Sequence, residues 1–135
     1  MIQFNEIENA YLFVSSAEHY MNSAFLNIKT GEIYYYSELT GENELPEDIE
    51  SDDYIEIPHK NDLDLGARLV FDFVSEYIPE KYEQVRDIFR RKGAYRRYKY
   101  LLDSLGMLQK WYEYEDQRTK AALLEWCKEN GLEVE

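Results

Sequence analysis

The sequence is poor in several residue types that organise small protein folds: it has one cysteine, two histidines and three prolines among 135 residues. The single cysteine, Cys127, cannot form an internal disulfide and excludes a zinc ribbon, which fits a reducing compartment. No hydrophobic run approaches the roughly 20 residues that a membrane-spanning helix requires. The first residues also lack the basic start and apolar run of a secretory signal. We therefore expect a cytoplasmic protein with no membrane segment.

Groupings of reactive side chains are scarce as well. Cys127 has the spacing of a buried helix face, and His19 and His59 fall in distant segments, so we expect no nucleophile paired with a base. The acidic residues of 40–53 lack the D-x-D-x-D-G spacing of a calcium loop. A phosphate-binding loop, a dinucleotide fingerprint and an H-E-x-x-H helix are also missing. We therefore expect no catalytic residues, no metal ligands and no cofactor.

Basic residues are outnumbered, with 15 Lys and Arg against 28 Asp and Glu, for a net charge of −13. Such a charge repels nucleic acid and anionic lipid at long range but permits a local basic patch. Residues 1–60 carry 2 basic and 13 acidic groups, net −11, whereas residues 61–135 carry 13 and 15, net −2. Between residues 86 and 99, seven Lys and Arg accompany only Asp87. This segment is the electropositive part of the chain.

The first 60 residues predict one helix and three strands. Apolar side chains recur at three- and four-residue spacing near the N-terminus, which predicts a helix over about 5–17 with Asn5 and Glu8 as a capping box. β-Branched and aromatic residues on both sides of Gly31 predict a β-hairpin over about 22–36, because glycine supplies the positive φ of a tight turn. A third strand is predicted at 54–57.

The rest of the chain predicts helices. They are expected over 62–77 from a cap at Asn61 or Asp62, from Pro79 to a left-handed C-terminal Gly93, over 94–105, and from about 107 to 130 as one helix or two. The apolar stripes of 62–77 and 94–105 should face each other or the sheet. We therefore expect a single α+β domain over 1–135, a small antiparallel β-sheet with a β-hairpin packed by four or five α-helices.

One stretch carries a resemblance to a known family. The motif RKGAYRRYK at 91–99, followed by Trp111-Tyr112, Trp126 and Asn130-Gly131-Leu132, resembles the bacterial Uncharacterised Protein Family 0158. The resemblance covers roughly residues 20–132, with tyrosine at 95 and 98 where the family pattern favours phenylalanine. It implies a shared fold and motif, and it implies no activity.

The candidate binding residues are the basic and aromatic side chains of this motif and of the segment after it. They are Arg90, Arg91, Lys92, Gly93, Arg96, Arg97, Lys99, Tyr100, Trp111 and Tyr112. In one interpretation the cations pair with the acidic N-terminal half and Lys99 pairs with Asp103. In the other, Gly93 opens a helix whose first amides and flanking cations bind phosphate or a single strand, with stacking on tyrosines.

The aromatic residues suggest a second kind of contact. Trp111 and Tyr112 are about 100° apart on a helix, so one can serve the core while the other reaches the surface. With Tyr34 and Tyr36 on the hairpin, exposed members of this set would favour a partner interface.

Together these features favour a non-enzymatic binding or regulatory module with a protein partner. The alternative is a nucleic-acid or phosphate-binding protein that uses the basic motif at 90–99. A third hypothesis, an enzyme with a site built from scattered carboxylates such as Asp72 and Glu76, stays open, and so does the oligomeric state.

Overall fold

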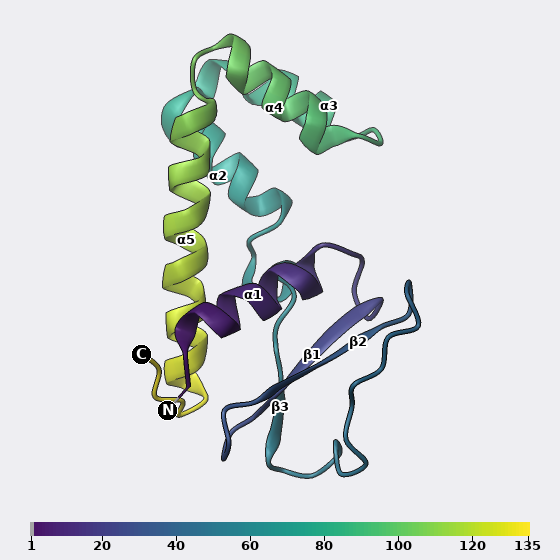
Figure 1. The fold of residues 1–135 in the computed structure, drawn as a ribbon. Helices are drawn as coiled ribbons and strands as arrows, with labels where there is room; N and C mark the ends of the chain where they lie inside the picture. The colour runs from purple at the N-terminus through teal and green to yellow at the C-terminus, as the bar shows by residue number, and fades with distance from the viewer. Residues whose placement is uncertain (1) are drawn as a thin grey trace. The chain divides into compact units, whose positions relative to one another are not determined.

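The fold of residues 2–135 is described by a computed structural model (Figure 1). About 52% of the chain is helical and 13% is in strands, which confirms the expected α+β class. The helices are α1 (Phe4–Ser15), α2 (Ala67–Tyr77), α3 (Tyr82–Ile88), α4 (Ala94–Ser104) and α5 (Leu108–Glu129), and the strands are β1 (Asn22–Asn27), β2 (Ile33–Ser37) and β3 (Tyr54–Glu56). Short 3₁₀ turns occupy Lys60–Leu63 and Pro79–Lys81.

The chain divides into two compact units. The sheet unit comprises the residues up to Leu63 together with Lys120–Glu135, and the helical unit comprises Asp64–Thr119. The sheet unit has 4 Lys and Arg against 18 Asp and Glu, net −14, whereas the helical unit has 11 against 10, net +1. The two units therefore differ more in net charge than do the two parts of the chain divided at residue 60.

The sheet unit is built on the predicted hairpin. β1 lies in the centre of the strand order β2-β1-β3 and pairs antiparallel with both neighbours, with Phe25 opposite Tyr34 in the hairpin. Gly31 in the turn has φ +81°, as its role in the turn requires. The hairpin and the third strand are thus confirmed to within one or two residues at each end.

Helix α1 packs on this sheet through Ile7, Tyr11 and Val14, which are all buried. The predicted capping box is wrong, because the helix starts at Phe4 and Gln3 stands at its N-cap without a side-chain cap. The amide of Phe4 donates instead to the carbonyl of Glu135 at 3.0 Å. The first turn of α1 is therefore satisfied by the C-terminal residue, a partner that local sequence does not reveal.

The helical unit has one core to which α2, α4 and α5 all contribute. Its buried members are Leu69, Val70, Phe73, Val74, Ile78, Val85, Tyr98, Leu102, Trp111 and Tyr114. Trp111 joins the two predicted stripes, since its ring contacts Phe73 of α2 at 5.3 Å and Tyr98 of α4 at 5.2 Å between centroids. The expectation that the stripes of 62–77 and 94–105 face a common core is confirmed.

Two predicted helix boundaries are wrong. The helix expected from residue 62 begins at Ala67, because the carboxylate of Asp62 accepts the backbone N–H of His59 and closes a 3₁₀ turn instead of capping an α-helix. Gly93 has the predicted left-handed conformation, with φ +73°, but it stands immediately before α4, since α3 has already ended at Ile88. The segment after Met107 is one continuous helix.

The hydroxyl of Tyr98 is buried and has no hydrogen-bond partner among the described residues. Burying an unpaired hydroxyl costs free energy that a phenylalanine ring avoids. We expect Tyr98→Phe to raise the free energy of unfolding by about 1 kcal/mol in urea titrations. A less stable variant would mean that this hydroxyl does have a partner.

Alkaline pH tests the same residue. Burial, and to a lesser degree the charge of Glu115, raises the pKa of the Tyr98 hydroxyl above its usual range. The unfolded chain loses the phenolic proton near pH 10 and the folded chain only at higher pH, so stability falls as the pH rises above about 10. In an alkaline titration followed by circular dichroism, Tyr98→Phe should keep its helical signal to higher pH than the parent. Superimposable titrations would contradict this assignment.

Candidate functional site

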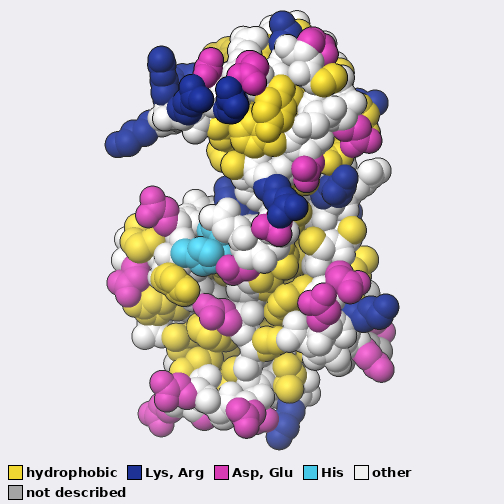
Figure 2. Space-filling model, turned by 180° about the vertical axis from the view of Figure 1, so that it is seen from behind, with side chains coloured by type: hydrophobic (Ala, Val, Ile, Leu, Met, Phe, Trp, Pro, Cys, Tyr) yellow, Lys and Arg dark blue, Asp and Glu magenta, His cyan; other side chains and the backbone are white. Residues whose placement is uncertain are grey.

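The basic motif forms one open surface on α4. We use the term α4 surface for the residues that line a pocket of about 450 Å³ there: Tyr95, Arg96, Lys99, Tyr100, Asp103 and Leu108. Figure 2 shows Lys and Arg side chains gathered beside hydrophobic ones over the region of α3 and α4 in Figure 1. The pocket thus combines cations with exposed rings.

The cations of α4 differ from those of α3 in how they are paired. Arg86 of α3 bonds Glu83, and Arg90, two residues after the end of α3, bonds Asp87 at 3.0 Å. Within the described helical unit, no ion pair is formed by the exposed side chains of Arg91, Lys92, Arg96, Arg97 and Lys99. These five charges are therefore available to an anionic ligand as far as their own unit is concerned.

The pairing expected between Lys99 and Asp103 is wrong. The Lys99 ammonium lies over the ring of Tyr112, with Nζ 5.6 Å from its centroid. A face of an aromatic ring attracts a cation through its quadrupole, and this contact replaces the carboxylate one turn along α4. The pairing of Arg96 and Arg97 with acidic residues of the N-terminal half stays a prediction.

The two neighbouring aromatic residues of α5 have separate positions, as their 100° spacing predicts. Trp111 is 1% exposed and belongs to the core, whereas Tyr112 is 41% exposed. Tyr100 on α4 is 73% exposed. The accessible rings of this region are therefore those of Tyr95, Tyr100 and Tyr112, whereas Trp111 is part of the core and is not accessible to a ligand.

The remaining predicted residues lie at the edge of this surface or outside it. The first turn of α4 is preceded by Arg91, Lys92 and Gly93. Arg90 forms an ion pair with Asp87 of α3. Tyr34 and Tyr36 belong to the sheet unit, where their hydroxyls donate to Glu32 and Glu38. The bond to Glu32 raises the pKa of Tyr34 to about 12.

Comparison with known proteins decides the family. The model of an uncharacterised protein family, UPF0158, matches residues 13–134, which is most of the chain. The chain belongs to UPF0158. No curated protein and no solved structure matches it. The UPF0158 match includes the basic motif and all three strands of the sheet.

Three further observations on this UPF0158 chain concern its cysteine, its helices and its metal-binding side chains. Cys127 is buried, as its spacing predicts, and burial raises the pKa of its thiol, which favours the protonated form. None of the helices among residues 2–135 combines the length and apolar character needed to cross a membrane. Over the same residues, no group of three or more His, Cys, Asp or Glu side chains is placed to hold a metal ion.

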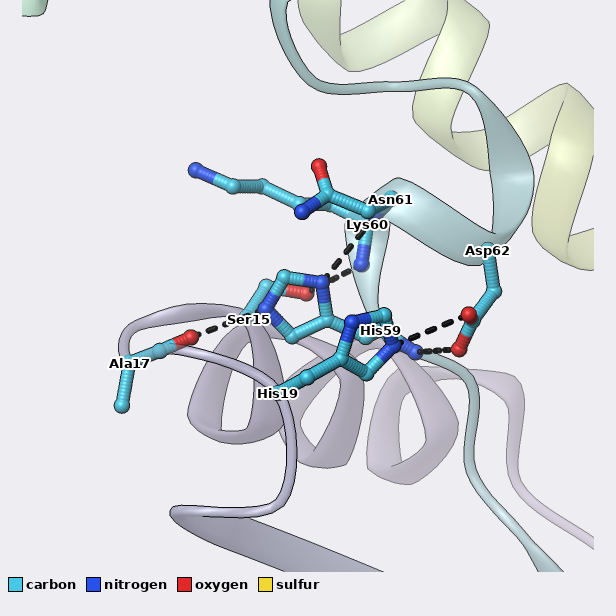
Figure 3. A network of polar contacts seen from close by, with 7 residues as sticks. All are labelled: Ser15, Ala17, His19, His59, Lys60, Asn61 and Asp62. Carbon is cyan, nitrogen blue, oxygen red and sulfur yellow. Dashed lines mark hydrogen bonds and ion pairs between the residues drawn. The ribbon is translucent and has the colours of Figure 1, made fainter.

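The sheet unit contains a polar network that the sequence did not reveal (Figure 3). His19 Nε2 donates to Asp62 Oδ1 at 2.9 Å, and Asp62 Oδ2 accepts the backbone N–H of His59 at 2.9 Å. The imidazoles of His19 and His59 stack with their centroids 4.3 Å apart. The Asp62 carboxylate therefore accepts one hydrogen bond from the His19 ring and one from the backbone of His59, although these histidines lie 40 positions apart in the chain.

Both ring nitrogens of His59 are occupied. Nδ1 accepts the N–H of Asn61 at 3.1 Å, so Nε2 carries the proton and donates to the carbonyl of Ala17 at 2.8 Å. His59 is 3% exposed and ties the loop after α1 to the 3₁₀ turn. His19 is the more exposed partner, and it reaches a pocket of the sheet unit.

Proposed function

We propose that this chain is a non-enzymatic binding module whose α4 surface docks an acidic segment of a partner protein. The observation that supports this most is the set of exposed cations on and before α4 that have no ion pair within their unit. Cations that served the fold alone would lie within reach of carboxylates, as Arg86 and Arg90 do. Their arrangement favours an anionic partner instead.

The rings beside these cations suggest what the partner segment contains. Tyr95, Tyr100 and Leu108 give the pocket an apolar lining, and its charged lining residues are Arg96, Lys99 and Asp103. A peptide that inserts one leucine or aromatic side chain and flanks it with carboxylates would match both features. The strongly acidic sheet unit would steer such a partner away from itself and toward α4.

Nucleic acid is the second candidate. Tyr100 and Tyr112 expose rings next to Lys99, an arrangement that suits stacking on single-stranded bases. The first amides of α4, after Gly93, can bind phosphate. The net charge of −13 opposes this candidate, because it repels a polyanion at long range. We place either activity in the bacterial cytoplasm, an assignment supported by the single buried cysteine.

The experiment that separates the candidates is a pair of fluorescence-anisotropy titrations. One probe is a labelled 12-residue peptide of Asp and Glu with a central leucine, and the other is a thymidine oligonucleotide of about the same length. We expect saturable binding of the peptide that weakens with salt. If four phosphates of the oligonucleotide were bound, its log affinity would fall with log salt at a slope of about −3.

The outcome assigns the partner class. Tighter binding of the oligonucleotide, with that slope, would transfer the function to nucleic acid. Failure of both probes to bind would contradict the proposal for the α4 surface.

A further inference from the structure

A second pocket lies in the sheet unit beside the histidine network, with a volume of about 400 Å³. We use the term histidine pocket for its lining residues: Val14, His19, Tyr20, Asn22, Glu56, Ile57, Pro58, His59, Asp62, Leu63, Trp126 and Glu129. Figure 2 shows a histidine on the surface among acidic and hydrophobic side chains. The pocket belongs to a different unit from the α4 surface and takes a different chemistry.

The charged groups that line the histidine pocket are carboxylates, with no Lys or Arg among its lining residues. The carboxylate of Asp62 already accepts hydrogen bonds from the His19 ring and from the backbone N–H of His59. Glu56 and Glu129 form no ion pair within the described sheet unit. Partial burial, and then the nearby charge of Asp62, raise the pKa of Glu56. The pocket therefore contains more negative charge than its own side chains compensate.

The walls of the pocket are aromatic. The His19 ring stacks on His59 and lies 5.2 Å from the ring of Tyr20, and Trp126 of α5 lines the same cavity. Tyr20 has φ +70°, which is uncommon for a bulky residue, and its side chain is 75% exposed. A flat cation could therefore stack on the exposed ring of Tyr20 while its charge is compensated by Glu56 or Glu129.

We propose that the histidine pocket binds a guanidinium group, carried by an arginine side chain of a partner or by a small organic cation. A guanidinium is planar, so it can stack on Tyr20 or Trp126. Its forked N–H groups match the two oxygens of Glu56 better than an ammonium does. It is also more weakly hydrated than an ammonium, so it enters a half-buried cavity at lower cost.

The test uses matched pairs of charged and neutral probes on the intact chain. Ethylguanidinium is compared with ethylurea, which has the same shape and no charge, and both are titrated at millimolar concentration into ¹⁵N-labelled protein. Acetyl-Gly-Arg-Gly-amide is compared in the same way with its citrulline analogue. We expect saturable shifts of the Tyr20 amide and the Trp126 indole N–H with the charged member of each pair.

Two variants separate local recognition from the general attraction of an acidic protein. Glu56→Gln keeps the side-chain shape, removes one charge from the pocket and should weaken ethylguanidinium binding by about fivefold or more. Glu50→Gln removes the same charge from an exposed loop residue outside the pocket and should leave the affinity unchanged. A spectrum that otherwise matches the parent shows that each variant is folded.

Each result has a definite meaning. If the arginine peptide binds at least as tightly as ethylguanidinium, the source of the group is a protein; if only ethylguanidinium binds, the source is a small cation. Equal binding of ethylurea, equal loss of affinity in Glu50→Gln, or absence of saturable shifts would overturn the proposal. The α4 surface does not enter this test, so its outcome is independent of the function proposed above.

Discussion

Leu102→Ala is expected to lower the free energy of unfolding by about 2–5 kcal/mol. Leu102 is fully buried in the core of the helical unit, and replacing it with alanine removes apolar contacts and leaves a cavity among rigid rings. Urea denaturation followed by circular dichroism measures the difference.

A matched control is available on the same helix end. Leu105 is 37% exposed, so Leu105→Ala makes the same chemical change where less surface is buried. Its expected cost is about 1 kcal/mol or less. Equal losses in the two variants would show that the buried face of α4 is assigned incorrectly.

Arg96→Glu/Arg97→Glu is expected to abolish binding of the acidic peptide while leaving the fold intact. Both side chains are exposed, and neither forms an ion pair within the described helical unit, so the fold loses little when their charge is reversed. The peptide would instead meet one new negative charge in the pocket lining, at residue 96, and a second on the next residue of α4. We expect an affinity loss of about 100-fold or more, measured by anisotropy, because like charges at an interface cost several kcal/mol.

Arg68→Glu/Arg86→Glu is the control for net charge. These arginines lie in the same unit and pair with Asp64 and Glu83, so their reversal costs a little stability but should leave peptide binding in place. The competing interpretation predicts the reverse for the α4 variant, a large drop in melting temperature as pairs with the acidic half become repulsions. The two variants together therefore separate a binding role from a structural one.

Local signals explain which parts of the fold the sequence predicts. The hairpin follows from β-branched and aromatic residues around Gly31, and the stripes of α2 and α4 follow from helical spacing. The sequence places the start of α2 five residues too early, because Asp62 has the residue type and position of a helix N-cap. Its carboxylate instead accepts hydrogen bonds from His19, 43 positions away, and from the backbone N–H of His59 at the 3₁₀ turn. A contact between residues so far apart in the chain produces no signal in the sequence around either residue.

The same distinction separates the two candidate sites. The α4 surface is predictable because its cations and rings are contiguous in sequence and share one helix. Spacing also indicates that Trp111 and Tyr112 divide between core and surface, although not which residue is buried. The histidine pocket could not be predicted, since His19, Glu56 and Trp126 come from three distant segments. The only local signal there is the short spacing of His59 and Asp62.

The most direct test of the central claim is a chemical-shift map of the acidic peptide on the ¹⁵N-labelled chain. If the α4 surface is the docking site, saturable shifts will cluster at Tyr95, Arg96, Lys99, Tyr100 and Leu108, with a smaller effect at Tyr112. Shifts that saturate elsewhere, or that spread evenly over Lys and Arg residues without saturating, would contradict the account.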